Sequence, residues 1–324
     1  MIIVTGGAGF IGSCVVSYLN QKGIDDIIIV DNLGKTEKWK NLVGKRYLEY
    51  WHKDDFRKKL ENYESELPIP DAVIHMGACS STTELDADYL YSNNTQYTQQ
   101  LISWANQKKI RFIYASSAAT YGDGSNGYSD NHEDIHKLRP LNMYGYSKQF
   151  LDEMVLRLKL EKTICGLKFF NVYGPNEYHK GSMTSVVFNA YNQIRDTGKV
   201  RLFKSYHPDY ADGQQKRDFV YVKDVARIIY WLLKNPNING IYNIGCGIAR
   251  TWNDLARAVF KALELEANID YIEMPEHLKG KYQYFTQAEN EKIIKAGWKE
   301  GFTCLEEGVK DYVQNYLAKD KRVY

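Results

Sequence analysis

TGGAGFIG, residues 5–12, follows a run of β-branched residues and leads into an amphipathic segment, which is the pattern of a strand, a glycine-rich turn and a helix. It fits both G-x-G-x-x-G and G-x-x-G-x-x-G. Glycines at these positions allow a tight turn and let backbone N–H groups approach a pyrophosphate at a helix N-terminus. The pattern alone is weak evidence. However, Asp31 ends the next predicted strand, 19 residues after Gly12, where an acid that binds a ribose belongs. This context favours a dinucleotide site over a glycine-rich turn without a ligand.

Strand-like and helical patterns alternate over the first half of the chain, which predicts βαβ units and a parallel, doubly wound Rossmann sheet. The predicted strands are 1–6, 26–32, 71–78, 111–117 and 164–174, and the predicted helices between them include 13–23 and 96–109. After Pro175 the regularity fades, and the predicted helices are 183–197, 224–235, 251–265 and 303–318. A strand at 240–245 is expected to return to the first sheet. We therefore expect a dinucleotide-binding domain at 1–174 and a smaller α/β, mainly substrate-binding domain at 175–324.

The composition is that of an ordinary globular protein. The 324 residues are 44% hydrophobic and 25% charged, and 42 basic minus 40 acidic residues leave a net charge of +2. Without a basic block, no nucleic-acid partner is expected. The chain enters a strand at once, with no signal-peptide pattern, and its longest apolar run is far too short to cross a bilayer. The five cysteines are scattered, which predicts no metal motif and favours reduced thiols in the cytoplasm.

NMYGYSKQFLDEM, residues 142–154, places Tyr144 four residues before Lys148 on one face of a predicted helix. Two other Tyr/Lys pairs in the chain have this spacing, so the spacing alone is weak evidence. What distinguishes this pair is Ser117, at the carboxyl end of a predicted strand, where ligands bind in such sheets.

The three residue types suit hydride transfer to and from an alcohol. A tyrosine has a reference pKa near 10, and a lysine with a nicotinamide cation beside it favours the phenolate. The serine can hydrogen-bond the substrate oxygen, and the lysine can hold the nicotinamide ribose. Asp31 argues for NAD, whereas Lys35, Lys38 and Lys53 could bind the 2′-phosphate of NADP. The residues leave the choice of nicotinamide cofactor open.

YGPNEYHKGSM, residues 173–183, is a predicted loop because proline and glycine punctuate it. His179 and Lys180 lie side by side in it. On composition alone, Lys180 is better explained as a solvated charge than as a catalytic group.

Several motifs together resemble the extended short-chain dehydrogenase/reductase family: TGGAGFIG, Ser117, YGYSK (144–148) and QQKRDFVYVKDVA (214–226). The resemblance covers nearly the whole chain. Ala118 and Ala119 stand where the dehydratases of this family carry an acidic pair, which excludes dehydration. Five strings narrow the resemblance to its ADP-heptose 6-epimerase branch: GACSSTTE (77–84), YASSAATYG (114–122), NMYGYSK (142–148), FFNVYGPNEYHKGSM (169–183) and LKGKYQYFTQA (278–288).

This resemblance implies NADP as the bound cofactor, with NAD as the alternative, and ADP-heptose as the substrate. It implies interconversion of ADP-D-glycero- and ADP-L-glycero-D-manno-heptose at C6″ through a ketone, for the lipopolysaccharide core. The hydroxyl occupies two positions in this reaction, so two acid/base groups are needed. The resemblance assigns these roles to Tyr144 and Lys180, assisted by Ser117 and Lys148. It also implies a homo-oligomer, with a homopentamer as the form expected.

The resemblance carries specific residues over. The cofactor site comprises Gly6, Gly9, Phe10, Ile11, Gly12, Asp31, Asn32, Lys38, Lys53, Met76, Gly77, Ala78, Cys79, Ser80, Asn93, Lys148, Val172 and Lys180. The substrate site comprises Ser117, Asn171, Ser182, Asn189, Phe203, Lys204, Ser205, Tyr206, Arg217 and Tyr282. This chain departs from the family pattern at Met76, which replaces a glutamate, and at Asn189, which replaces a common histidine. Its segment 203–217 is also longer than usual.

Two other functions compete with this one. The first is a UDP-hexose 4-epimerase of the same superfamily, which would turn over UDP-galactose. The second is a non-catalytic NADP-binding sensor; such proteins commonly lose the tyrosine or the lysine, and both are present here.

Overall fold

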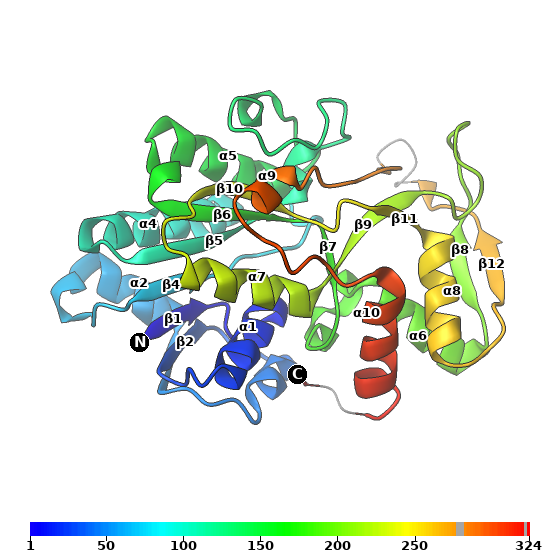
Figure 1. Cartoon of the computed structure of the whole chain (residues 1–324), viewed down its shortest axis with the longest axis horizontal. Coiled ribbons are helices and arrows are strands. Elements are labelled where there is room, and N and C mark those ends of the chain that lie inside the picture. Colours follow the sequence, from blue (N-terminus) through cyan, green and yellow to red (C-terminus); the bar gives the residue numbers. More distant parts are fainter. Residues whose placement is uncertain (277–281, 321–322) are drawn as a thin grey trace.

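The computed structural model describes residues 1–276, 282–320 and 323–324. Its main sheet has seven parallel strands in the order β10-β6-β5-β4-β1-β2-β3 (Figure 1). These strands are β1 Ile2–Thr5, β2 Ile27–Asp31, β3 Glu49–His52, β4 Ala72–His75, β5 Arg111–Ser117, β6 Ile164–Phe169 and β10 Gly240–Ile244. The strand order reverses between β1 and β4, and their carboxyl ends therefore form the crevice where doubly wound sheets bind ligands. The predicted fold class is confirmed.

Helices cover both faces of the main sheet. On one face α1 (Phe10–Gln21) packs against α7 (Val222–Lys234). On the other lie α2 (Lys53–Asn62), α3 (Ala87–Leu90), α4 (Tyr97–Lys108) and α5 (Met143–Arg157). The alternation of a strand separates the two cores: Ile2 and Val4 belong to the cluster with α1 and α7, whereas Ile3 belongs to the opposite cluster.

The predicted strand 164–174 is two strands. β6 ends at Phe169, and β7 (Asn171–Tyr173) belongs to a separate three-stranded sheet with β9 (Lys216–Tyr221) and β11 (Ala249–Thr251). The N–H of buried Phe170 still donates to Ile244 of β10, at 3.1 Å, but its carbonyl accepts from the N–H of Val172, at 2.9 Å. This tight local bond turns the chain out of the main sheet.

The remaining elements form a second core beside the main sheet (Figure 1). They are α6 Val186–Thr197, β8 Val200–Phe203, α8 Trp252–Ala262, β12 Ile269–Ile272 and α10 Leu305–Tyr312, with α9 Glu291–Lys295 against β10. Local sequence sets some of their ends. Thr251, for example, caps α8 through a reciprocal capping box with Asp254.

The β3–α2 unit was not predicted. β3 is a four-residue edge strand whose side chains are exposed or half-buried, so it carries no apolar alternation to read. Within the described ranges, no helix combines the length and apolarity needed to cross a membrane.

Candidate active site

The turn between β1 and α1 requires its glycines. Gly6 has a φ of +66°, and a Cβ there would lie 2.6 Å from the backbone nitrogen of Gly77. A Cβ on Gly12 would lie 2.1 Å from the carbonyl oxygen of Gly6. No side chain caps α1, whose N-cap is Gly9. The first N–H groups of this helix are therefore available to an anion, and the turn fits a dinucleotide pyrophosphate.

A cavity of about 400 Å³ opens at the carboxyl ends of β1, β2, β4 and β5. All the predicted cofactor residues line it: Gly6, Gly9, Phe10, Ile11, Gly12, Asp31, Asn32, Lys38, Lys53, Met76, Gly77, Ala78, Cys79, Ser80, Asn93, Lys148, Val172 and Lys180. Ser117 and Tyr144 line it as well. Residues from widely separated parts of the sequence thus meet at one cavity.

The Asp31 carboxylate at the end of β2 is held from two sides. It accepts from the Ala8 N–H at 2.9 Å, and the Lys38 ammonium lies 2.5 Å from its other oxygen. Lys38 also donates to the carbonyl of Asn32, at 2.9 Å. Lys53 lines the cavity too and pairs with Asp54, at 2.7 Å. Two lysines therefore line the cavity together with this acid.

Tyr144, Lys148 and Ser117 meet across β5 and α5. Asn142 caps α5 by accepting from the Gly145 N–H at 2.8 Å, so Tyr144 and Lys148 lie on the first two turns. The Lys148 ammonium is only 2% exposed and donates to the carbonyl of Ala115 at 2.8 Å. Burial lowers its pKa to about 8, although the charge of Asp152 opposes the shift.

Burial raises the pKa of the Tyr144 phenol, and a hydrogen bond with Ser117 only partly opposes this. The phenol is therefore neutral at pH 7 in the protein alone. The expectation that a lysine and a nicotinamide cation together favour the phenolate concerns the enzyme with its cofactor bound, in which the cation would oppose the desolvation of the phenolate.

Hydrogen bonds of the buried Glu177 side chain hold the loop that carries Lys180 in place. Its Tyr178–Met183 part forms a 3-10 turn in which Gly181 has a φ of +56°. Glu177, fully buried, accepts hydrogen bonds from the Ser185 hydroxyl at 2.6 Å and from the Tyr312 hydroxyl at 3.0 Å. The loop is therefore fixed to the start of α6 and to α10.

Lys180 itself is half-buried and lies over the Phe10 ring, 5.3 Å from the ring centroid. Burial lowers the pKa of its ammonium, and the buried Glu177 carboxylate opposes the shift. This lysine is thus not a solvated surface charge. It lines the same cavity as Tyr144 but belongs to a different element of the fold, the turn Tyr178–Met183.

Most of the predicted substrate residues lie outside this cavity, because only Ser117 is part of its lining. Asn171 is exposed on β7, and Ser182 follows Lys180 in the same turn. Arg217 is buried between the rings of Trp252 and Tyr282, with its guanidinium carbon 5.5 and 5.4 Å from their centroids. The side-chain amide of Asn189 donates a hydrogen bond to the Ser185 carbonyl at 3.1 Å, at the start of its own helix α6.

The longer segment 203–217 makes a hydrogen bond within itself and an ion pair with the residue that follows β12. The Ser205 N–H donates to Asp212 at 2.7 Å, and Lys204 pairs with Glu273 at 2.7 Å. The N–H of Tyr206 donates to the Tyr284 hydroxyl at 3.1 Å. Phe203 ends β8. Part of the predicted string 278–288 lies outside the described residues.

His179 is a lining residue that was not predicted as part of the site, although the HK pair had drawn attention to it. Its Nδ1 lies 3.3 Å from the Asn41 amide nitrogen. Burial lowers the pKa of its imidazole to about 4, with help from Lys38 and Lys180. The ring is therefore neutral at pH 7. Most of the remaining lining residues match no sequence motif, because only the tertiary structure brings them to the cavity. They are Thr5, Val30, Tyr89, Tyr97, Ala115, Ser116, Phe169 and Phe170.

Comparison with known proteins agrees with this site. The model of the NAD dependent epimerase/dehydratase family matches residues 2–245. The ADP-L-glycero-D-manno-heptose-6-epimerase of Nitratidesulfovibrio vulgaris strain DP4 is 57% identical over 319 residues, which cover 98% of both chains. The enzyme of the same name from Fusobacterium nucleatum is 53% identical over 99% of both chains.

A solved structure agrees as well. The ADP-L-glycero-D-manno-heptose-6-epimerase of Helicobacter pylori superimposes with a TM-score of 0.80 at 29% identity, over 98% of this chain and 96% of the other. The chain therefore belongs to the NAD dependent epimerase/dehydratase family, and it is an epimerase that uses a nicotinamide dinucleotide.

Proposed function

We propose that this epimerase interconverts ADP-D-glycero-D-manno-heptose and ADP-L-glycero-D-manno-heptose, with NADP as its bound cofactor. One observation carries the proposal: two candidate acid/base groups, Tyr144 and Lys180, line the same cavity from different elements of the fold. The relatives that are 53–57% identical and bear the name of this activity give the substrate.

The chemistry needs two proton-transfer groups. When the C6″ alcohol becomes a ketone, one group takes the hydroxyl proton; when the ketone is reduced from the other face, a second group returns a proton there. The bound nicotinamide supplies the hydride acceptor and then the donor. Tyr144 serves one stereochemistry and Lys180 the other, and the sugar rotates between the two steps.

Three further residues position the substrate, the cofactor or the loop of Lys180 around the two acid/base groups. Ser117, whose hydroxyl lowers the pKa of the Tyr144 phenol, holds the substrate oxygen beside this phenol. Lys148 is buried one turn away with its ammonium on the Ala115 carbonyl, in a position to hold the nicotinamide ribose. Glu177 anchors the Lys180 loop to α6 and α10, which keeps the second group at a fixed distance from the first.

The lysines beside Asp31 support NADP. A carboxylate at the end of β2 would repel a 2′-phosphate, but the Lys38 ammonium neutralises it at 2.5 Å, and Lys53 adds a second positive charge to the lining. We expect Lys38→Ala combined with Lys53→Ala to weaken NADP binding at least tenfold and to leave NAD binding within about twofold, as for the loss of charge-assisted phosphate contacts. Titration with both cofactors tests this. Equal weakening of the two would contradict the assignment.

The decisive experiment measures whether the purified protein epimerises the proposed substrate. Purified protein, with bound nucleotide identified after denaturation of a sample, is incubated with ADP-D-glycero-D-manno-heptose, and chromatography separates the two C6″ epimers. A mixture approaching equilibrium without added cofactor is the expected result. No conversion by protein that contains the nicotinamide dinucleotide would refute the proposed substrate, and turnover of UDP-galactose instead would favour the 4-epimerase.

The chain is expected to assemble with copies of itself. Tyr91 and Tyr146 are 47% and 60% exposed, and Phe150 packs against both rings, which places an aromatic patch where α5 meets the segment Tyr91–Gln96. Light scattering after gel filtration measures the number of subunits, and five are expected.

A further inference from the structure

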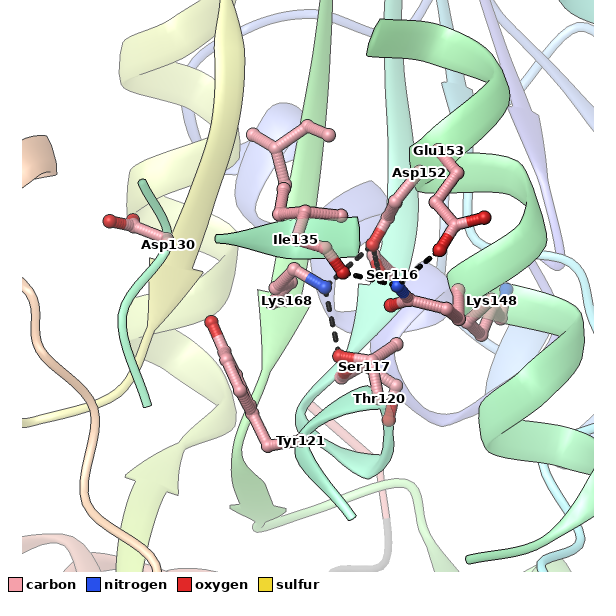
Figure 2. Close-up of polar contacts among 12 residues, drawn as sticks. Ser116, Ser117, Thr120, Tyr121, Asp130, Ile135, Lys148, Asp152, Glu153 and Lys168 are labelled. Atoms are coloured by element: carbon pink, nitrogen blue, oxygen red, sulfur yellow. Dashed lines mark hydrogen bonds and ion pairs between the residues drawn. The ribbon is translucent and has the colours of Figure 1, made fainter. Parts of the chain in front are cut away.

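Lys168 and Asp152 form an ion pair that is fully buried behind the candidate site. Their Nζ and Oδ2 atoms lie 2.7 Å apart, and both side chains are 0% exposed (Figure 2). Lys168 comes from β6 and Asp152 from α5. The carboxylate also accepts from the Ser116 hydroxyl at 2.6 Å and from the Tyr114 hydroxyl at 2.9 Å, both on β5. The pair thus joins two strands of the sheet to one helix.

Net stability does not explain such a pair well. Removing two charges from water costs about as much as their attraction returns, and apolar residues of similar volume often stabilise a core as well or better. The neighbouring strand β6 also has a glycine where a side chain would collide with this hydrogen-bond network. Gly166 stands opposite Tyr114 on β6, where a Cβ would lie 2.5 Å from the Tyr114 hydroxyl oxygen. A role in the site is the better explanation.

The network reaches the catalytic groups at two points. The Lys168 ammonium donates to the Thr120 hydroxyl at 2.8 Å, and this hydroxyl donates to the carbonyl of Ser117 at 2.9 Å (Figure 2). Asp152 lies one helical turn after Lys148, on the helix that also carries Tyr144. The ion pair therefore contacts both β5, which carries Ser117, and α5, which carries Tyr144. The relative position of these two elements places the serine near the tyrosine.

We propose that the Lys168–Asp152 pair is a positioning unit of the active site, which holds the Ser117 end of β5 against the Tyr144–Lys148 face of α5 and places a fixed negative charge beside Lys148. This inference rests on the proposed epimerase function for its kinetic test, but not for its spectroscopic one. Neither residue lines the cavity, so their role is to position the catalytic residues and not to react.

Three titratable groups interact with Lys148. Asp152 lies on its own helix, Cys79 follows β4, and His75 is on β4. The pKa of His75 is lowered to about 3, mainly by burial, so this imidazole is neutral at pH 7. Asp152 is therefore the group whose loss should change the protonation of Lys148 most, and that loss should lower the pKa of the lysine.

The kinetic test uses Asp152→Asn and Thr120→Val. Each should lower kcat by about ten- to a hundredfold, as misplaced catalytic groups do, while KM stays within about twofold. Thr120→Val keeps the ion pair and removes only its link to Ser117, so it remains informative if Asp152→Asn does not fold. Lys168→Arg keeps the charge and should retain most of the activity. Normal kcat in both test variants would overturn the proposal.

Asp224→Asn is the matched control. Asp224 is a buried carboxylate on α7 that accepts from Arg227 and, at 2.7 and 2.8 Å, from the N–H and hydroxyl of Thr303, outside the cavity lining. Its loss should reduce stability as the loss of Asp152 does, but kcat should stay within about twofold. An equal loss of kcat in Asp224→Asn would show that destabilisation alone lowers activity, and this would overturn the proposal.

The second test needs no substrate. In protein labelled with ¹³C at the lysine Cε, the signal that disappears in Lys148→Met is followed against pH. Asp152→Asn should move its midpoint down by about one unit, whereas Thr120→Val and Asp224→Asn should leave it in place. An unchanged midpoint in Asp152→Asn would refute the charge role. If the wild-type protein does not epimerise ADP-heptose, the proposed function fails while this titration still decides the inference.

Discussion

At the scale of single residues, burial acts in opposite directions on the two candidate acid/base groups. Burial raises the pKa of the Tyr144 phenol, which makes it a poor base, and lowers the pKa of the Lys180 ammonium, which makes it a better one. The reference pKa values of tyrosine and lysine are close to each other, so these opposite shifts separate the two groups in proton affinity. Before the cofactor binds, the phenol therefore holds its proton more tightly than the ammonium does.

Both acid/base groups should be essential. Tyr144→Phe and Lys180→Met should each lower kcat for epimerisation by at least about a thousandfold, because each removes a proton-transfer group. The mass of the bound nucleotide and the unfolding temperature serve as controls for an intact site. Near-normal turnover in either variant would contradict the two-base scheme.

Ser117 should contribute less. Ser117→Ala should lower kcat by about a hundredfold, which is typical of one positioned polar group in an active site. Its hydroxyl also accepts from the Ala119 N–H at 3.1 Å, so a loss of about 1 kcal/mol in stability is expected as well. Steady-state kinetics with both epimers measures the effect, and a change within twofold would remove Ser117 from the mechanism.

At the scale of elements, the β1–α1 turn depends on the absence of side chains. A Cβ on Gly12 would meet the Gly6 carbonyl oxygen at 2.1 Å, and this oxygen accepts the Gly9 N–H at 2.9 Å. The backbone itself would have to move. The helix N-terminus and the strand end would then lose the spacing that a pyrophosphate needs.

Gly12→Ala should therefore cost about 1–3 kcal/mol in stability, as overpacking does, and should abolish tight dinucleotide binding. Urea unfolding and the nucleotide content of the purified protein measure the two effects. Gly23→Ala is the control, because Gly23 has a φ of +75° but no atom within 4 Å of an added Cβ. It should lose stability and keep its nucleotide. Normal nucleotide content in Gly12→Ala would show that the turn is not the binding site.

At the scale of the whole molecule, buried neutral histidines couple folding to pH. His75 is 2% exposed, with its ring nitrogens 2.6 and 2.8 Å from the hydroxyl oxygens of Thr5 and Thr98, and burial lowers its pKa to about 3. The unfolded chain binds a proton at this residue below pH 6.5, and the folded chain does not. Stability from this group is therefore complete above pH 6.5 and falls as the pH decreases toward 3.

Between pH 7 and pH 4.5 this residue alone should cost about 3 kcal/mol of unfolding free energy. His75→Gln can keep both hydroxyl contacts and has no proton to gain, so its loss over the same range should be smaller by about that amount. Urea unfolding of both proteins at the two pH values gives the comparison, in which carboxylates common to both cancel. Equal losses would show that the imidazole is not buried in its neutral form.

Local sequence determined much of this protein. The alternation of strands and helices predicted the parallel sheet, and the glycine pattern predicted the turn. The Tyr/Lys spacing with Ser117 predicted three of the residues that line the cavity, and the family resemblance supplied most of the others. These features can be read because they depend on periodicity and on chemistry between near neighbours. The domain division at residue 174 stays a prediction.

Only the tertiary structure decided the rest. The break between β6 and β7, the β3–α2 edge unit and the lining role of His179 depend on contacts between distant segments, which leave no local pattern. The direction of the Tyr144 pKa depends on how much water the fold excludes, and the sequence does not contain that quantity. Likewise, Asp152 and Lys168 are sixteen positions apart in the sequence, and they form an ion pair only because α5 packs on the sheet that contains β6.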